Sequence, residues 1–252
     1  MTQFSDLLRQ WRRTRRLSQL DLALQANVSA RHISFLETGR ARPSREMIVQ
    51  LGEALTIPLP ARNQMLAAMG FTPRYAARTW DEAAMAPIRR AIDRTLDNHA
   101  PFPGIAIDRL WRLTRMNAPA QKMFGMLGLT EGSSMLDMLR NPLLWDMVDN
   151  WPEVAHHSML RLRTESTAQG GVPELDAAAT FLATHAKSGP DIGPTVPTVF
   201  RFGDQQLSMF GTIAQFGSPE DATLAELKIE LFFPADTATE QALVAMFDDV
   251  ST

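Results

Sequence analysis

Apolar side chains recur at helical spacing throughout the first 70 residues. Residues 4–15 repeat apolar positions every three or four residues, with arginines on the opposite face. Three serines stand directly before further short apolar runs and suit helix N-caps; they are Ser18, Ser29 and Ser44. Asn27 and Gly39 fall where the second and third helices should end, and both residues tolerate left-handed backbone. With a fifth helix over residues 61–69, the pattern predicts a compact all-α domain.

Beyond Gly70 the pattern changes. Residues 70–78 contain Gly, Thr and Pro and indicate a boundary, and residues 80–98 predict an amphipathic connecting helix. Five strands are then expected, over residues 104–108, 110–114, 198–202, 207–216 and 226–233. Helices are expected from Asn117, over 134–168 with breaks at Pro142 and Pro152, and over 173–186 and 237–247. This part should be α+β, with a small antiparallel sheet flanked by helices.

Length and composition are those of an ordinary globular chain. The 252 residues are 45% hydrophobic and 21% charged, with no cysteine and therefore no disulfide or thiolate metal site. We expect a DNA-binding domain over 1–70, a linker and connecting helix over 71–100, and a second domain over 101–252. No apolar run is long enough for a membrane span, and MTQFSDLLRQ lacks a secretory pattern, so we expect a cytoplasmic protein.

Charge is divided unevenly along the chain. The net charge is −3, yet residues 1–70 carry ten arginines against five acidic residues, whereas residues 101–252 carry ten basic and nineteen acidic residues. A basic head on an acidic body indicates that the head alone meets a polyanion.

The segment from Leu17 to Arg40 has helix-turn-helix spacing. Ala23 is small where two helices must cross, Asn27 turns the chain, and Ile33 and Leu36 fasten the second helix inward. The outward positions of that helix are suited to reading base edges in the major groove; they are Ala30, Arg31, Ser34 and Phe35. Residues placed for contacts to phosphate are Gln19, Ser29, Arg40 and Arg42. A plain helical bundle with solvated arginines is the alternative, which this spacing disfavours.

Over residues 3–66 the chain resembles the phage-repressor-like (XRE-type) helix-turn-helix family of bacterial regulators. The resemblance rests on Ser18-Gln19, Leu22-Ala23, Val28-Ser29, Ile33-Ser34, Leu36-Glu37, Gly39 and Pro43-Ser44. It implies sequence-specific binding to double-stranded DNA, with Gln19 and Arg40 on phosphates and the outward residues on bases. Asn27 stands where Gly is usual, and Phe35 where a polar residue often reads a base. We expect a homodimer, because one such domain contacts few base pairs.

The second domain resembles MmyB-like regulators with a PAS-like ligand-binding domain. The matching segments are 99–103, Asp108-Arg109-Leu110-Trp111, Met116-Asn117-Ala118, 212–217 and 221–236. The resemblance implies a pocket for an apolar molecule, with a fatty acid as the favoured effector.

The residues themselves add a weaker signal for a ligand. Seven of the 14 methionines fall between residues 116 and 159, and methionine adapts to flexible apolar chains, although such residues also fill ordinary cores. The candidate ligand-binding residues are Trp111, Met116, Asn117, Phe124, Met138, Leu143, Trp145, Trp151, His156 and Met159. His156 and His157 are adjacent on a helix and point about 100° apart, so only one can face a site. Arg112, Asn117 or His156 is the expected partner of a carboxylate head group.

Enzymatic motifs are missing from the sequence. It has no Gly-rich phosphate loop, no nucleophile elbow and no metal-binding histidine spacing, so we expect neither catalysis nor a bound metal or cofactor other than an effector. A competing hypothesis is that the second domain only dimerises or binds another protein. An internal apolar cavity favours the sensor, and a filled core with an exposed apolar face favours the dimerisation module.

Overall fold

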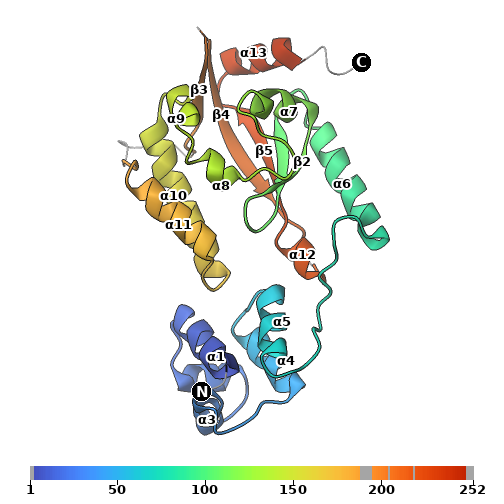
Figure 1. The fold of residues 1–252 in the computed structure, drawn as a ribbon, viewed down its shortest axis with the longest axis vertical. Coiled ribbons are helices and arrows are strands. Elements are labelled where there is room, and N and C mark those ends of the chain that lie inside the picture. The colour runs from blue at the N-terminus through green and yellow to red at the C-terminus, as the bar shows by residue number, and fades with distance from the viewer. Residues whose placement is uncertain (1–2, 188–194, 204, 218, 248–252) are drawn as a thin grey trace. The chain divides into compact units, whose positions relative to one another are not determined.

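The computed structural model describes residues 3–187, 195–203, 205–217 and 219–247 (Figure 1). Contacts within the chain define two compact units. Unit 1 comprises Met1–Arg78 with Ser166–Val172 and Ser218–Ala225, and unit 2 comprises Thr79–Glu165, Pro173–Gly217 and Glu226–Thr252. No helix among the described residues is long and apolar enough to cross a membrane.

Five helices form the main part of unit 1. They are α1 (Gln3–Thr14), α2 (Gln19–Gln25), α3 (Ala30–Thr38), α4 (Arg45–Ala54) and α5 (Leu59–Ala67). Their inward positions close a core in which Phe4, Leu8, Leu22, Ile33 and Leu36 are completely buried. The all-α prediction for this part is confirmed.

Local sequence signals set the ends of these helices. The Ser18 hydroxyl accepts a hydrogen bond from the Asp21 backbone N–H, while the Asp21 carboxylate accepts one from the Ser18 N–H, which forms a capping box. Ser29 and Ser44 cap α3 and α4 through their hydroxyls, which accept hydrogen bonds from the backbone N–H groups of His32 and Met47. Asn27, at φ 50°, makes the turn between α2 and α3.

Unit 2 is built on one antiparallel sheet. Its strands are β1 (Gly104–Ile107), β2 (Leu113–Met116), β3 (Thr198–Phe202), β4 (Gln205–Ala214) and β5 (Lys228–Pro234). They are hydrogen-bonded in the order β2-β1-β5-β4-β3, so β5, which comes last in sequence, pairs with β1 and joins the two hairpins. The predicted α+β class with a small antiparallel sheet is confirmed.

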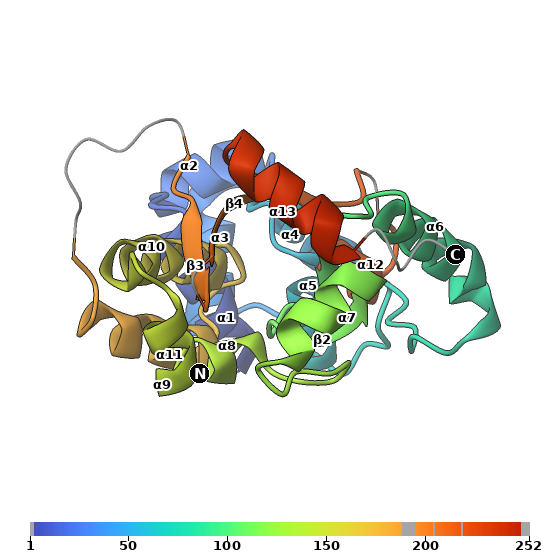
Figure 2. The ribbon, with the colours of Figure 1, turned by 90° about the horizontal axis from the view of Figure 1, so that it is seen from above.

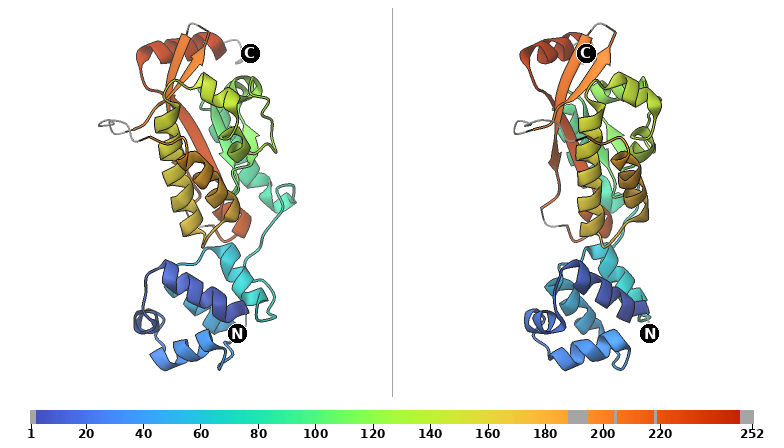
Figure 3. Two further views of the ribbon diagram at one scale, coloured as in Figure 1. Left: turned by 60° about the vertical axis from the view of Figure 1, so that its left-hand side comes forward. Right: turned by 90° about the vertical axis from the view of Figure 1, so that its left-hand side faces the viewer.

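Helices surround this sheet. They are the 3-10 turn η1 (Ala83–Met85) and the helices α6 (Ala86–Asp97), α7 (Ala118–Gly125), α8 (Met135–Met138), α9 (Pro142–Met147), α10 (Trp151–Ala168), α11 (Pro173–Ala183) and α13 (Thr237–Phe247), with α12 (Ala222–Ala225) assigned to unit 1. α6 and α7 contact β1, α9 contacts β3, and α13 contacts β4 and β5. Figure 2 shows α10 and α13 on opposite sides of β3 and β4. Figure 3 shows α10 and α11 side by side.

Several element boundaries differ from those predicted. The connecting helix begins at Ala86 and not at residue 80, because Pro87 suits the first turn of a helix and the three residues before Ala86 form the 3-10 turn η1. β2 begins at Leu113 and not at residue 110, because the Asp108 carboxylate accepts hydrogen bonds from the N–H groups of Leu110 and Arg112 and forms the turn. β4 starts two residues earlier than predicted and β5 two residues later.

Candidate functional site

The outward face of α3 carries the residues that the sequence predicts for base contacts. Arg31 is exposed, and Ala30, Ser34 and Phe35 are half-buried. The Arg31 guanidinium lies 5.2 Å from the centre of the Phe35 ring. This cation–π contact restricts the arginine and gives Phe35 a role that its position alone did not suggest.

The residues predicted for phosphate contacts lie around the ends of α2 and α3. Arg40 is exposed just after α3. The exposed Arg42 donates a hydrogen bond from Nη2 to the Met69 carbonyl at 3.1 Å. Ser29 is occupied as the N-cap of α3, where its hydroxyl accepts from the His32 N–H.

Gln19 is engaged inside unit 1. Its amide donates a hydrogen bond from Nε2 to Glu37 Oε2 at 2.8 Å. Glu37 is only 2% exposed, and Arg12 donates to both of its carboxylate oxygens. Burial raises the pKa of Glu37, but the hydrogen bonds from Arg12 and Gln19 and the charges of Arg12 and Arg9 outweigh burial and lower it. Glu37 therefore joins α1, α2 and α3 from a buried position that was not predicted from the sequence.

A cavity of about 640 Å³ opens within unit 2 between α7–α10 and the sheet. Its wall is largely apolar; the residues are Trp111, Phe124, Met135, Met138, Leu139, Leu144, Val148, Trp151, Val154, His157, Ser158, Arg161, Thr195, Val196, Thr198, Phe200, Phe210, Gly211, Ile213, Glu230 and Phe232. This volume lies within the range of small-molecule sites, about 300–1,000 Å³. We call it the ligand cavity.

Strand register forms the floor of the ligand cavity. Gly211 pairs with Phe232, and Ile213 pairs with Glu230. Directly paired residues of antiparallel strands share a face of the sheet, so all four lie on the face that lines the cavity. Gly211 has no side chain and leaves space there. Ile213 is 49% exposed, which marks the side where the cavity opens to solvent.

One end of the ligand cavity is charged. Arg161 donates a hydrogen bond from Nη2 to Glu230 Oε1 and another from Nε to Glu165 Oε1, the latter at 2.9 Å. Lys228 donates to Glu165 from behind, and Glu165 also accepts from Trp111 Nε1 at 2.8 Å. The cations Arg161 and Lys228 and the anions Glu165 and Glu230 therefore form one charged cluster.

The pKa shifts of Arg161 and Glu165 favour the charged form of each side chain. Burial lowers the pKa of Arg161, but the charges of Glu230 and Glu165 and the hydrogen bonds to them outweigh burial, so the pKa is raised overall. Burial likewise raises the pKa of Glu165, whereas its hydrogen bonds and the charges of Arg161 and Lys228 lower it overall.

Trp111 holds a strained backbone at the edge of the cavity. Its φ of 60° lies in the left-handed region, where a bulky residue is rare. Its indole is fixed by the hydrogen bond to Glu165 and by the Arg161 guanidinium, 4.3 Å from the ring centre. These contacts offset the strain and fix the orientation of one cavity wall.

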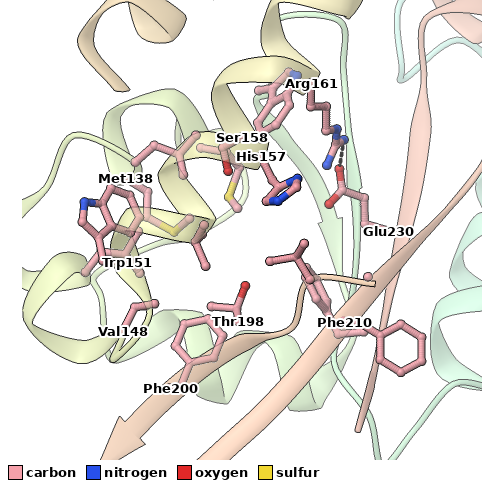
Figure 4. Close-up of a pocket in the computed structure, with 18 of the residues that line it drawn as sticks. Met138, Val148, Trp151, His157, Ser158, Arg161, Thr198, Phe200, Phe210 and Glu230 are labelled. Carbon is pink, nitrogen blue, oxygen red and sulfur yellow. Dashed lines mark hydrogen bonds and ion pairs between the residues drawn. The ribbon is translucent and has the colours of Figure 1, made fainter. Parts of the chain in front are cut away.

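Two buried polar atoms of the wall have no hydrogen-bond partner among the described residues. They are Nε1 of Trp151 and Nε2 of His157. Figure 4 shows the His157 ring pointing into the cavity beside the hydroxyl of Ser158, with the Thr198 hydroxyl facing it from β3. Buried polar groups without a protein partner are expected to meet a water or a ligand.

Of the ten residues predicted for ligand binding, four line the cavity: Trp111, Phe124, Met138 and Trp151. Asn117 is buried and structural, because its amide bonds the backbone of Gly104, Leu96, Phe102 and Ala120. Trp145 stacks behind Trp151, with ring centres 5.9 Å apart. Met116 and Met159 are buried outside the lining, Leu143 is 62% exposed, and His156 is outside the lining.

Apart from Met135, Leu139, Leu144 and Val148 around α8 and α9, the cavity residues that were not predicted lie on α10, on the later strands and just before β3. His157, Ser158 and Arg161 follow Trp151 at helical spacing, which is a signal that the sequence does carry. On two of the strands the lining residues lie two positions apart on one face: Thr198 and Phe200 on β3, and Glu230 and Phe232 on β5. Arg161, and not Arg112, is the arginine at the cavity. Among the described residues, no group of His, Asp or Glu side chains is placed to hold a metal ion.

Comparisons with known proteins agree with this arrangement. Residues 3–65 match a helix-turn-helix domain model, and residues 88–246 match the model of the MmyB-like transcription regulator ligand binding domain. The two matches define a helix-turn-helix regulator with a ligand-binding domain. The chain belongs to the MmyB-like transcription regulators, and it is a DNA-binding transcription regulator whose second domain binds a small molecule. Both matched families are regulatory and not enzymatic.

A solved structure, the PAS domain from Bordetella pertussis BvgS, is similar to this chain at a TM-score of 0.32 and 13% sequence identity, over 65% of this chain and 96% of that domain. No curated protein matches the chain.

Proposed function

We propose that this protein binds a specific DNA operator as a homodimer and is controlled by a small apolar ligand, a fatty acid or a similar lipid, held in the ligand cavity. The observation that carries the proposal is the apolar cavity of about 640 Å³, whose lining residue Ile213 stays 49% exposed. An apolar wall open to solvent gains free energy when an apolar ligand covers it. Because its proposed partner is chromosomal DNA, we expect the protein to act in the cytoplasm.

Ligand binding would change DNA affinity only if the ligand prefers one arrangement of the two DNA-binding heads. The free energy of that preference sets the size of the change. We therefore expect the ligand-free and ligand-bound protein to differ in operator affinity, which is measured by titrating operator DNA with each form.

The first experiment titrates lipid-free protein with straight-chain lipids of increasing length. Trp111 and Trp151 lie in the cavity wall, so intrinsic tryptophan fluorescence should report binding. Each buried CH₂ contributes roughly 0.8 kcal/mol, or about fourfold in affinity, until the cavity is full. Mass spectrometry of molecules extracted from the natively purified protein identifies the natural ligand.

A cavity-filling variant supplies the control. A Cβ at Gly211 would make ordinary contacts with the Phe232 ring, at 3.7 and 3.8 Å, so Gly211→Leu should fold and project into the cavity. It should abolish lipid binding and the lipid effect on operator affinity. Thr212→Val, on the opposite face of β4, should change neither. Flat titrations with lipid-free wild-type protein would instead favour a dimerisation or protein-interaction module.

A further inference from the structure

The ligand cavity contains a hydrogen-bonding group that the protein leaves unused. His157 Nε2 is buried and has no hydrogen-bond partner within the described part of the chain. Its ring points into the cavity, where the hydroxyls of Ser158 and Thr198 also face (Figure 4). A neutral imidazole nitrogen and a hydroxyl can each donate or accept a hydrogen bond, according to the tautomer or rotation. These three groups suit a ligand hydroxyl or carbonyl equally well.

The nearby charges disfavour an anionic head group. Arg161 is the only arginine or lysine among the described wall residues, and it already donates to Glu230 and to Glu165. Lys228, behind the wall, is committed to Glu165 in the same way. The cluster is balanced, and Glu230 itself lines the cavity.

A carboxylate brought into this cavity would lose its hydration and would stand beside Glu230. It could accept a hydrogen bond from Arg161 only by competing with the carboxylates of Glu165 and Glu230. An unbalanced charge in a largely apolar site is costly, because too little solvent remains to screen it. A hydroxyl, ester, lactone or amide carries no such cost and satisfies the free nitrogen of His157.

We propose that the ligand cavity selects an uncharged lipid, with its polar head at His157, Ser158 and Thr198, and discriminates against the free fatty acid. This inference rests on the proposed function, since it names the head group of the ligand that fills the same cavity. The apolar part of the ligand would lie against the side chains around Met138, Leu144, Val148 and Phe200.

The test compares head groups at one chain length. Lipid-free full-length protein is titrated at pH 8 with decanoic acid, 1-decanol, decanamide and methyl decanoate, followed by tryptophan fluorescence. We expect at least one of the three neutral ligands to bind about tenfold more tightly than the acid. Two variants then locate the head group. His157→Phe keeps an aromatic ring but has no hydrogen-bonding nitrogen. In this variant the affinities for the neutral ligand and for decanoic acid should differ by no more than about threefold.

Glu230→Gln tests the charge argument. It removes one anion without changing side-chain size, so Arg161 is left with excess positive charge. Affinity for decanoic acid should then rise about tenfold, while affinity for decanol stays within about twofold. Glu153→Gln, the same change on α10 outside the cavity lining, should leave both affinities unchanged and is the matched control.

The outcomes separate this inference from the proposed function. Acid binding as tight as the neutral ligands in the wild-type protein would overturn the inference and leave lipid sensing intact. A neutral preference that survives both His157→Phe and Glu230→Gln would overturn the placement of the head group. No binding of any of the four ligands by folded, lipid-free protein would overturn the proposed function itself.

Discussion

Arg12 and Glu37 form a two-pronged ion pair inside the DNA-binding domain, with Nε 2.6 Å from Oε1 and Nη2 2.9 Å from Oε2. Glu37 stands on α3, directly behind the surface expected to meet DNA. The pair fixes α3 against α1, and Gln19 extends it to α2. The position of the recognition surface therefore depends on a buried carboxylate that does not itself face DNA.

Removing the arginine should destabilise this domain. Arg12→Ala leaves Glu37, 2% exposed, as a buried charge without its main partner, which costs about 3–5 kcal/mol. Arg13→Ala, at the exposed neighbouring position, should cost less than about 0.5 kcal/mol. Chemical denaturation of the two variants measures the difference. Equal stability of the two variants would show that the ion pair contributes little.

The pH dependence of this ion pair follows from the lowered pKa of Glu37. A carboxyl whose pKa is lower in the folded protein contributes stability above its ordinary value of 4.5, and this contribution is lost as pH falls through the lower folded value. The difference in unfolding free energy between the wild type and Arg12→Ala should therefore become smaller as the pH falls below 4.5. A gap that stays constant down to pH 2 would contradict this assignment.

Arg31 should read a base, and Arg40 should hold the DNA backbone. Because Arg31 is exposed on the outward face of α3 and rests on Phe35, Arg31→Ala should cost about 1–3 kcal/mol at the operator and relax one base position. Arg40→Ala should weaken binding to all sequences about equally and reduce the salt dependence. Operator and random DNA are compared by fluorescence anisotropy at several salt concentrations. An equal loss on both DNAs for Arg31→Ala would remove its base-reading role.

Glu226 should make the second domain less stable in mildly alkaline solution. Burial raises the pKa of its carboxyl to about 7, despite the charges of Arg109 and Lys228, which lower it. Because the folded pKa exceeds the ordinary value of 4.5, the stability contribution is fully present below pH 4.5 and is lost as pH rises through 7. Glu226→Gln should therefore be more stable than the wild type at pH 8, by about 1–3 kcal/mol, and about equal to it at pH 4.5.

Thermal unfolding at the two pH values measures the effect of Glu226→Gln. Glu174→Gln, an exposed carboxylate at the start of α11, is the control and should be neutral at both. A stabilisation by Glu226→Gln that is the same at pH 4.5 and pH 8 would contradict the titration of Glu226.

Local signals made most of the fold predictable. The capping serines and the left-handed positions of Asn27 and Gly39 specify helix ends through contacts within a few residues. The strands were found as elements, but their ends shifted. Asp108 folds the β1–β2 turn with its own side chain, and that competition between turn and strand is not visible in hydrophobic alternation.

The ligand cavity was less predictable because its residues meet only after distant strands pair. The density of Met and Trp pointed to the correct region, yet Asn117 and Trp145 proved to be occupied by structural contacts. His156 was named as a candidate and His157 was not, because adjacent helix positions cannot be told apart without knowing which face of the helix meets the sheet. Glu230 enters the site through its register opposite Ile213 on β4, and register depends on the whole sheet.

Operator binding should require two copies of this chain. One helix-turn-helix domain contacts too few base pairs for high specificity, whereas two copies related by a two-fold axis read a palindrome with half-sites about one helical turn apart. Changing that spacing by about half a turn should place the second half-site on the opposite side of the duplex and reduce affinity about 100-fold or more. The measurements are sedimentation of the protein, with and without operator, and binding to operators of altered spacing; α6 and unit 2 are the expected interface. A monomer at micromolar concentration in both conditions, or affinity that does not depend on spacing, would contradict the dimer.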